Sequence, residues 1–163
     1  MNRRNFFSLG LGVVAISMAP STLSAINFRD TMPKAWTASK VEEGMKEVFG
    51  SSTTVNSKVK LKAPDIAENG AVIPLTVSSK LAGSKVAIFQ DANPESTVAV
   101  FTVPKGGIID YSVRIKMAKT GTISAVVESN GKLYAASKLV KVTIGGCGGW
   151  FSINNTKQNL NTK

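Results

Sequence analysis

The sequence predicts a mainly β fold, in which an antiparallel β-sandwich follows one short helix. Two observations carry this prediction. Apolar and polar residues alternate through most of residues 58–144, as they do in strands that bury one face. Turn sequences such as Asn69-Gly70, Asn93-Pro94 and Asn130-Gly131 interrupt the alternation about every ten residues, and no helical pattern intervenes that would indicate a parallel sheet. An immunoglobulin-like sandwich fits this spacing best.

Length and composition fit one domain and exclude several functions. The chain has 163 residues, 43% of them hydrophobic, which suffices for one core and is too little for two. It contains one cysteine and no histidine, so an internal disulfide is excluded, and so are most metal sites and histidine-based acid–base catalysis. We therefore expect neither self-contained catalysis nor a cofactor.

Residues 1–25 predict an export signal. Arg3 and Arg4 precede two phenylalanines and an apolar stretch, residues 9–19, that is too short to span a bilayer. The twin arginine resembles a Tat signal, which addresses folded proteins for export. We expect cleavage near Ala25 and a periplasmic mature protein; a membrane anchor is the alternative interpretation.

The net charge is +10, and it falls to +8 once Arg3 and Arg4 leave with the signal, because 18 basic and 10 acidic residues remain. The lysines are scattered singly along the mature chain. Nucleic-acid binding needs a concentrated basic patch with stacking aromatic residues, so we do not expect it. Anionic small molecules and acidic proteins remain compatible with the charge.

The mature chain begins with a predicted helix over residues 40–50. Ser39 is expected to cap this helix, Glu42 to complete a capping box, and Gly50 to end it. Four apolar residues share one face, which we interpret as a packing surface: Val41, Met45, Val48 and Phe49. Residues 51–57 are predicted to be a polar linker.

The strands follow in order, each marked by apolar residues two apart. These residues are Val59, Leu61 and Ala63; Ile73, Leu75 and Val77; Val86 and Ile88; Ala99, Phe101 and Val103; Ile109, Tyr111, Val113, Ile115 and Met117; and Ile123, Ala125 and Val127. The last hairpin turns at Asn130-Gly131 and returns through residues 132–144. Pro74, inside the second of these strands, indicates a sheet edge or a bulge there.

The only thiol follows the final strand, in the sequence Gly145-Gly146-Cys147-Gly148-Gly149. Glycine has no side chain, so this arm is predicted to be slender and flexible, and able to present a sulfur inside a narrow cleft. A lone cysteine in an exported protein is either used covalently or paired with another chain. Because no histidine can deprotonate it, we interpret Cys147 as a handle that carries a substrate. An incidental cysteine in a turn-rich tail stays an alternative.

This ending, after Val-Lys-Val-Thr-Ile and a Tat-like signal, resembles the SoxY family, the sulfur-carrier subunits of the SoxYZ complex in thiosulfate oxidation. The resemblance covers almost the whole mature chain. It extends to Ala67-Glu68-Asn69-Gly70 with Pro74-Leu75, to the Asn93-Pro94 turn with Val98-Ala99-Val100-Phe101, to residues 114–120, and to Asn130-Gly131 with Tyr134. In one respect the chain departs from the family, because residues 150–163, beginning with Trp150-Phe151, continue beyond the motif.

The resemblance implies a covalent carrier and names its partners. A SoxZ-like subunit would pair with this chain, and Cys147 would carry the sulfur. The haem enzyme SoxAX would join thiosulfate to the thiol as a cysteine S-thiosulfonate, and SoxB would release sulfate and leave a cysteine persulfide. SoxCD is the candidate for oxidising the sulfur that remains. The chain itself would catalyse none of these steps, and Gly145, Gly146, Gly148 and Gly149 would keep the arm slim.

The expected organisation is therefore a signal (1–25), an N-terminal segment with a short helix (26–57), the sandwich (58–144), the carrier arm (145–149) and a polar extension (150–163). The extension is open to three interpretations: a segment removed by processing, the mark of a variant carrier with other partners, or a harmless addition. Two other classes of function stay open. One is a structural or adhesive immunoglobulin-like module, and the other is a thiol enzyme, which the lack of a second cysteine disfavours.

Overall fold

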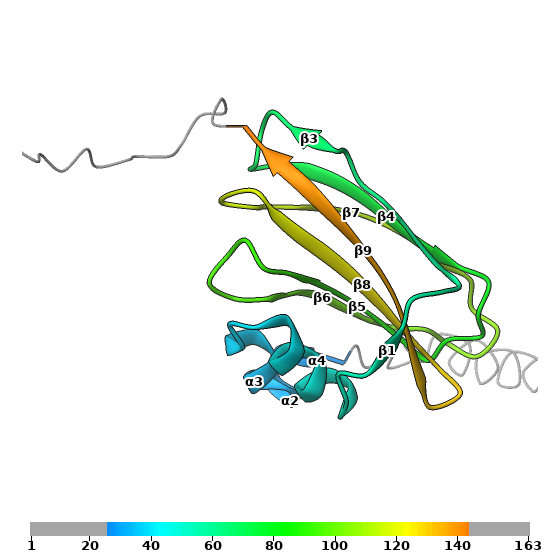
Figure 1. The fold of residues 1–163 in the computed structure, drawn as a ribbon. Helices are drawn as coiled ribbons and strands as arrows, with labels where there is room; N and C mark the ends of the chain where they lie inside the picture. Colours follow the sequence, from blue (N-terminus) through cyan, green and yellow to red (C-terminus); the bar gives the residue numbers. More distant parts are fainter. Residues whose placement is uncertain (1–25, 144–163) are drawn as a thin grey trace, which may run out of the picture.

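The computed structural model describes residues 26–143, which form a sandwich of two β-sheets with three short helices against one outer face (Figure 1). The larger sheet has the order β1-β9-β8-β5-β6, with β3 also paired to β9, and the smaller sheet has the order β2-β4-β7. The elements are α2 (Phe28–Thr31), α3 (Pro33–Thr37), α4 (Val41–Phe49), β1 (Thr54–Val55), β2 (Val59–Lys62), β3 (Ile66–Ala67), β4 (Ile73–Ser79), β5 (Lys85–Gln90), β6 (Thr97–Thr102), β7 (Ile109–Ile115), β8 (Gly121–Ser129) and β9 (Lys132–Val142).

The mainly β sandwich predicted from the alternation of apolar and polar residues is confirmed. The inward residues of the smaller sheet meet those of β5, β8 and β9 in one core, which includes Ile73, Val77, Ile88, Ile123 and Val140, all of them fully buried. β4 pairs antiparallel with both β2 and β7, and β8 pairs antiparallel with both β5 and β9. The hairpin at Asn130-Gly131 is also confirmed, and both residues have the positive φ, 51° and 70°, that such two-residue turns require.

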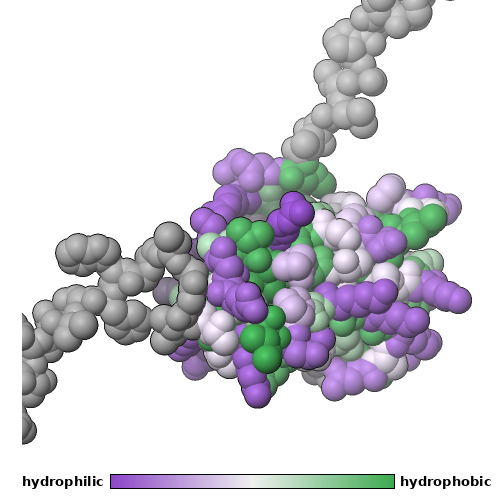
Figure 2. All heavy atoms as spheres, turned by 90° about the horizontal axis from the view of Figure 1, so that it is seen from above, coloured by the Kyte–Doolittle hydropathy of each residue, from purple (hydrophilic) through white to green (hydrophobic). Residues whose placement is uncertain are grey.

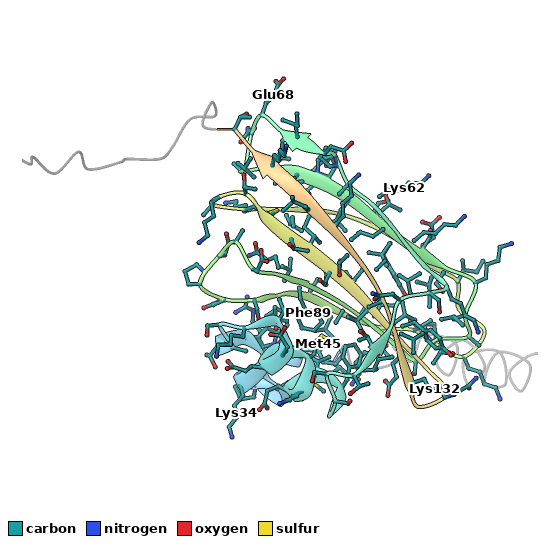
Figure 3. All side chains as sticks on the ribbon, in the orientation of Figure 1. Lys34, Met45, Lys62, Glu68, Phe89 and Lys132 are labelled. Carbon is teal, nitrogen blue, oxygen red and sulfur yellow. The ribbon has the colours of Figure 1, made fainter. Side chains whose placement is uncertain are left out.

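A second core lies on the other face of the larger sheet. Met45 and Val48 of α4 pack there against Ala87 and Phe89 of β5 (Figure 3). The apolar stripe predicted on the helix is thus a packing surface, and β5 is buried on both faces. Lys85 completes the contact, because its Nζ donates to the carbonyl of Val48 at 2.9 Å and lies over the ring of Phe49.

The predicted helix forms, but its predicted cap does not. α4 ends at Gly50 in the left-handed region, as expected, yet its N-cap is Lys40, and no side chain bonds there, so the capping box of Ser39 and Glu42 is wrong. Ser96, in the β5–β6 turn, does not cap the free N–H groups of α4, but it anchors the segment before the helix, since its Oγ donates to the carbonyls of Ala38 and Lys40, both at 3.0 Å. Long-range bonds therefore hold the start of the helix in place.

Four short elements differ from the sequence-based expectation. The helices α2 and α3 precede α4 where one helix was expected, and the predicted linker 51–57 contains β1. β1 and β3 both pair with β9 in parallel, which adds two short parallel ladders to an otherwise antiparallel sandwich. Pro74 is at an edge as predicted, because the pairing of β2 with β4 stops at Thr76.

Candidate functional site at the end of β9

The predicted site residues lie outside the described residues. Cys147 and its flanking glycines, Gly145, Gly146, Gly148 and Gly149, follow the last described residue, Thr143, and the export arginines Arg3 and Arg4 precede the first. The extension 150–163 is also outside. What the structure describes is the place from which the arm starts, at the end of β9 beside β3 (Figure 1).

β9 is held on both sides up to its last described residue. On the side of β3, the N–H of Lys141 donates to the carbonyl of Asp65 at 2.9 Å, and the N–H of Thr143 donates to that of Ala67 at 3.0 Å. On the side of β8, the N–H of Val142 donates to Thr120 Oγ1 at 3.0 Å. The backbone is thus fixed to Thr143, only four residues before Cys147.

Gly70 lets the surrounding loops approach the end of β9. Its carbonyl accepts from the N–H of Met117 at 2.8 Å, which ties the β3–β4 loop to the segment after β7. A Cβ on Gly70 would collide with the carbonyl oxygen of Met117 and would lie 2.9 Å from Cγ1 of Val142. Only glycine therefore fits between the start of the β7–β8 loop and the last residues of β9.

We expect Gly70→Ala to lower the free energy of unfolding by about 1–3 kcal/mol, the usual cost of forcing an atom into a packed site. The neighbouring exposed Ala71, changed to Ser, is the control and should stay within about 0.5 kcal/mol of the parent. Urea unfolding followed by circular dichroism measures both. Equal free energies of unfolding for Gly70→Ala and the parent would show that the β3–β4 and β7–β8 loops can move apart to admit a methyl group without loss of stability.

Two polar side chains brace the neighbouring segments. Asn93, in the β5–β6 turn, donates from Nδ2 to the carbonyl of Lys116 at 3.0 Å and accepts from the N–H of Ala118 at 2.8 Å. Lys138 of β9 forms an ion pair with Asp65 at 3.0 Å, and its Nζ also donates to the carbonyl of Ala63. The β2–β3 connection and the β7–β8 loop are therefore both fastened around the start of the arm.

The rest of the described surface offers little chemistry. In residues 26–143, no three His, Cys, Asp or Glu side chains come together as metal ligands would. A hollow of about 480 Å³ lies at the opposite edge of the larger sheet, where Phe101 of β6 stacks on Tyr111 of β7 at 4.8 Å. Its lining is mostly apolar and contains no ionisable group except Tyr111. The part of the chain that the structure describes also contains no helix long and apolar enough to span a membrane.

The sandwich and the cysteine that follows it both fall within a match to a known protein family. The family model described as "Sulfur oxidation protein SoxY" matches residues 45–147, which are more than half of the chain. The chain belongs to the SoxY family. The match starts within α4, includes every strand of the sandwich and ends at Cys147.

One solved structure supports the same assignment. The structure titled sulfur carrier protein SoxY, from Chlorobium limicola f thiosulfatophilum, is 40% identical over 67% of this chain and 96% of its own, with a TM-score of 0.59. A superoxide reductase (neelaredoxin) from Ignicoccus hospitalis is 19% identical over 53% of this chain and 81% of its own, with a TM-score of 0.49, a likeness from which no activity follows. A search of curated proteins gives no match. The protein is thus a member of a family of sulfur carriers that serve sulfur oxidation.

Sequence reasoning predicts the arm but does not reveal the structure that holds the chain before it. Ala67 belongs to the two-residue strand β3, and Asp65 directly precedes it; a strand of two residues is too short to show any periodicity. Asn69-Gly70 and Asn93-Pro94 are recognisable as turn sequences and as part of the family pattern, and Thr120 only as part of that pattern. The one available signal is Gly70, which precedes a strand with a buried face. Such a glycine indicates that another segment of backbone lies close to it, but it does not indicate which segment.

Proposed function

We propose that the mature protein is a periplasmic sulfur carrier that binds thiosulfate-derived sulfur covalently on Cys147 and presents it to the enzymes of the Sox system. Export through the Tat pathway, directed by Arg3 and Arg4, delivers the folded chain to that compartment. A SoxZ-like subunit pairs with it, and SoxAX, SoxB and SoxCD are its transient partners. The carrier itself supplies the thiol and none of the catalytic groups.

One observation carries the proposal: the match to the family runs through the whole sandwich and ends at Cys147. Two further observations support it. Cys147 is the only cysteine, and two glycines flank it on each side. The backbone bonds at Lys141, Val142 and Thr143 hold the chain up to the start of the arm, so the arm has a fixed origin on the sandwich.

The chemistry needs only a thiol from this chain. When thiosulfate is joined to Cys147, the thiol loses its proton, a bond forms between its sulfur and the outer sulfur of thiosulfate, and two electrons pass to the haem enzyme. Hydrolysis then breaks the bond between the outer sulfur and the sulfonate, water supplies the fourth oxygen of sulfate, and a persulfide stays on Cys147. Both adducts are anionic, and the net charge of +8 that remains after the signal is removed favours holding them near the protein.

The intact mass of protein isolated from thiosulfate-grown cells tests the proposal. We expect species heavier than the unmodified chain by a thiosulfate group or by one sulfur atom, with the added mass lost on reduction and absent from cells grown without thiosulfate. The same material reports the mature N-terminus, expected at Ala25 or Ile26, and shows whether a small β-sandwich subunit co-purifies. A thiol that never carries extra sulfur in actively oxidising cells would favour a structural module.

The glycines beside the thiol should set the rate of loading. Gly146→Val places a branched side chain next to Cys147, which stiffens the arm and widens it where a narrow cleft must admit it. We expect loading by the thiosulfate-oxidising enzyme to slow by about tenfold, equivalent to about 1.4 kcal/mol in the barrier, with the unfolding midpoint unchanged. The control is Gly131→Asn, at the far hairpin, a turn position that accepts asparagine. Equal loading rates for Gly146→Val and the parent would contradict this role.

A further inference from the structure

The shortness of the arm limits where a partner enzyme can sit. Thr143 is fixed on β3, and four residues lead from it to Cys147. Fully extended, four residues span at most about 14 Å. If Cys147 is the carrier thiol, as proposed above, an enzyme that takes this thiol into a cleft must place the mouth of the cleft against the end of the sandwich where β9 stops.

A protein–protein interface of ordinary size covers many residues besides those of the arm. Stable complexes bury about 800 Å² per partner, equivalent to a disc of roughly 16 Å radius. Leu139 lies four strand positions before Thr143, a distance of about 13 Å along β9. Ile66 is closer, because it is the register partner of Lys141. Both residues therefore fall within the area that a docked enzyme would cover.

Ile66, Leu139 and Lys141 share one face of the larger sheet, which we name the arm-side face. Along β9, Val140 and Val142 point into the core, so Leu139 and Lys141 project from the opposite face. Ala67 pairs with Val142 and packs in the same core, so its neighbour Ile66 projects with Lys141. The helices cover this face only at the start of β9, around Leu133 and Ala135.

The arm-side face carries two large exposed apolar side chains. Ile66 is 58% exposed and Leu139 is 53% exposed, although the adjoining residues of the same strands are buried or half-buried on the inner face. Figure 2 looks onto the molecule from above Figure 1, and it shows hydrophobic residues at the surface between hydrophilic ones. Exposed apolar residues beside a functional segment are typical of interaction sites, and docking would remove them from water.

The positive charge on the arm-side face indicates the charge of the partner. Lys141 is exposed on the arm-side face. Among the described residues, no carboxylate lies within ion-pair distance of it; the neighbouring Asp65 forms its ion pair with Lys138. Without the signal, the chain as a whole carries +8. An acidic rim on the partner would therefore be attracted to this face and oriented by it.

We infer that the arm-side face, formed by Ile66, Leu139 and Lys141, is the docking surface for the enzyme that loads Cys147, and that the mouth of this enzyme's cleft is apolar with an acidic rim. The surface is separate from the arm: the arm delivers the sulfur, and the face holds the enzyme over it. Removing the apolar contacts should weaken docking and leave the thiol itself unchanged.

The test compares loading by the thiosulfate-oxidising haem enzyme with the reaction of the same thiol with a small maleimide. In the full carrier complex, the double variant Ile66→Ser/Leu139→Ser should raise the KM for loading by about tenfold with little change in kcat, as expected when apolar contact residues of an interface are lost. The maleimide rate should match that of the parent. Ile108→Ser removes a residue that is 83% exposed, on the β6–β7 loop, and serves as the matched control.

A charge-reversal pair keeps the inference testable if the double variant folds poorly. Lys141→Glu should raise KM and weaken its dependence on salt, whereas Lys132→Glu, at the other end of β9 (Figure 3), should behave like the parent. The inference is overturned if Ile66→Ser/Leu139→Ser loads within about twofold of Ile108→Ser, or if its maleimide rate falls in step with its loading rate. Failure of the carrier role itself looks different, because the parent would then accept no thiosulfate at Cys147.

Discussion

Cells that carry Cys147→Ser in place of the parent chain should form no sulfate from thiosulfate through this carrier. A serine hydroxyl is close in size to the thiol but cannot form the sulfur–sulfur bond that holds the adduct, so every later step loses its substrate. We expect residues 26–143 to fold in this variant as they do in the parent. Sulfate release and thiosulfate consumption are measured in a strain that lacks the native gene and expresses either form at equal level.

Adding a thiol elsewhere provides a matched control for this variant. Ser137→Cys in the Cys147→Ser background places a cysteine at an exposed position of β9. A thiol fixed on the sandwich has no tether to carry it into a cleft, so sulfate formation should stay at background. If Cys147→Ser alone still supports sulfate formation at the parent rate, the sulfur is carried elsewhere, and the account of the arm is wrong.

Phe89→Ala should cause the largest loss of stability, about 3–5 kcal/mol. Phe89 is fully buried in β5, packs under Met45 of α4, and meets the ring of Phe49 edge to face at 6.4 Å. The change removes the largest fully buried side chain of the core that packs the helices against the larger sheet. Because a domain of this size has a total stability of about 5–15 kcal/mol, much of it would be lost.

Urea unfolding measures this loss, with Phe101→Ala as the comparison. Phe101 lies on the adjacent strand β6, but it is only partly buried and stacks on Tyr111 near the surface. Its removal should cost clearly less than that of Phe89. A loss below about 1 kcal/mol for Phe89→Ala would mean that the helices are held by other contacts.

The strands could be predicted because apolar residues at every second position mark the buried face of each strand. Ile73, Leu75 and Val77, for example, alternate with residues that are exposed or half-buried, and the structure buries these three between the sheets. The turn at Asn130-Gly131 was equally local, since its two residues are those that accept a positive φ. The sequence is therefore sufficient to predict a strand or a turn that depends only on residues close to it in the chain.

The parts that could not be predicted depend on distant residues. β1 and β3 are two residues long and exist because β9 offers them an edge. The start of α4 is fixed by Ser96, which lies more than fifty residues away in the chain. At the candidate site the same limit applies: the Gly-Gly-Cys-Gly-Gly motif could be recognised directly, but the bonds from Ala67 and Thr120 that hold its base required the fold.

Following the outer sulfur of thiosulfate tests the central claim most directly. Thiosulfate radiolabelled only at that atom is given to the carrier complex with its loading and hydrolysing enzymes, and the carrier is then digested without reductant. The account predicts that the label stays on the peptide containing Cys147 after unlabelled sulfate has been released, and that reduction frees it. Sulfate formed at the full rate with no label ever on that peptide would contradict the account.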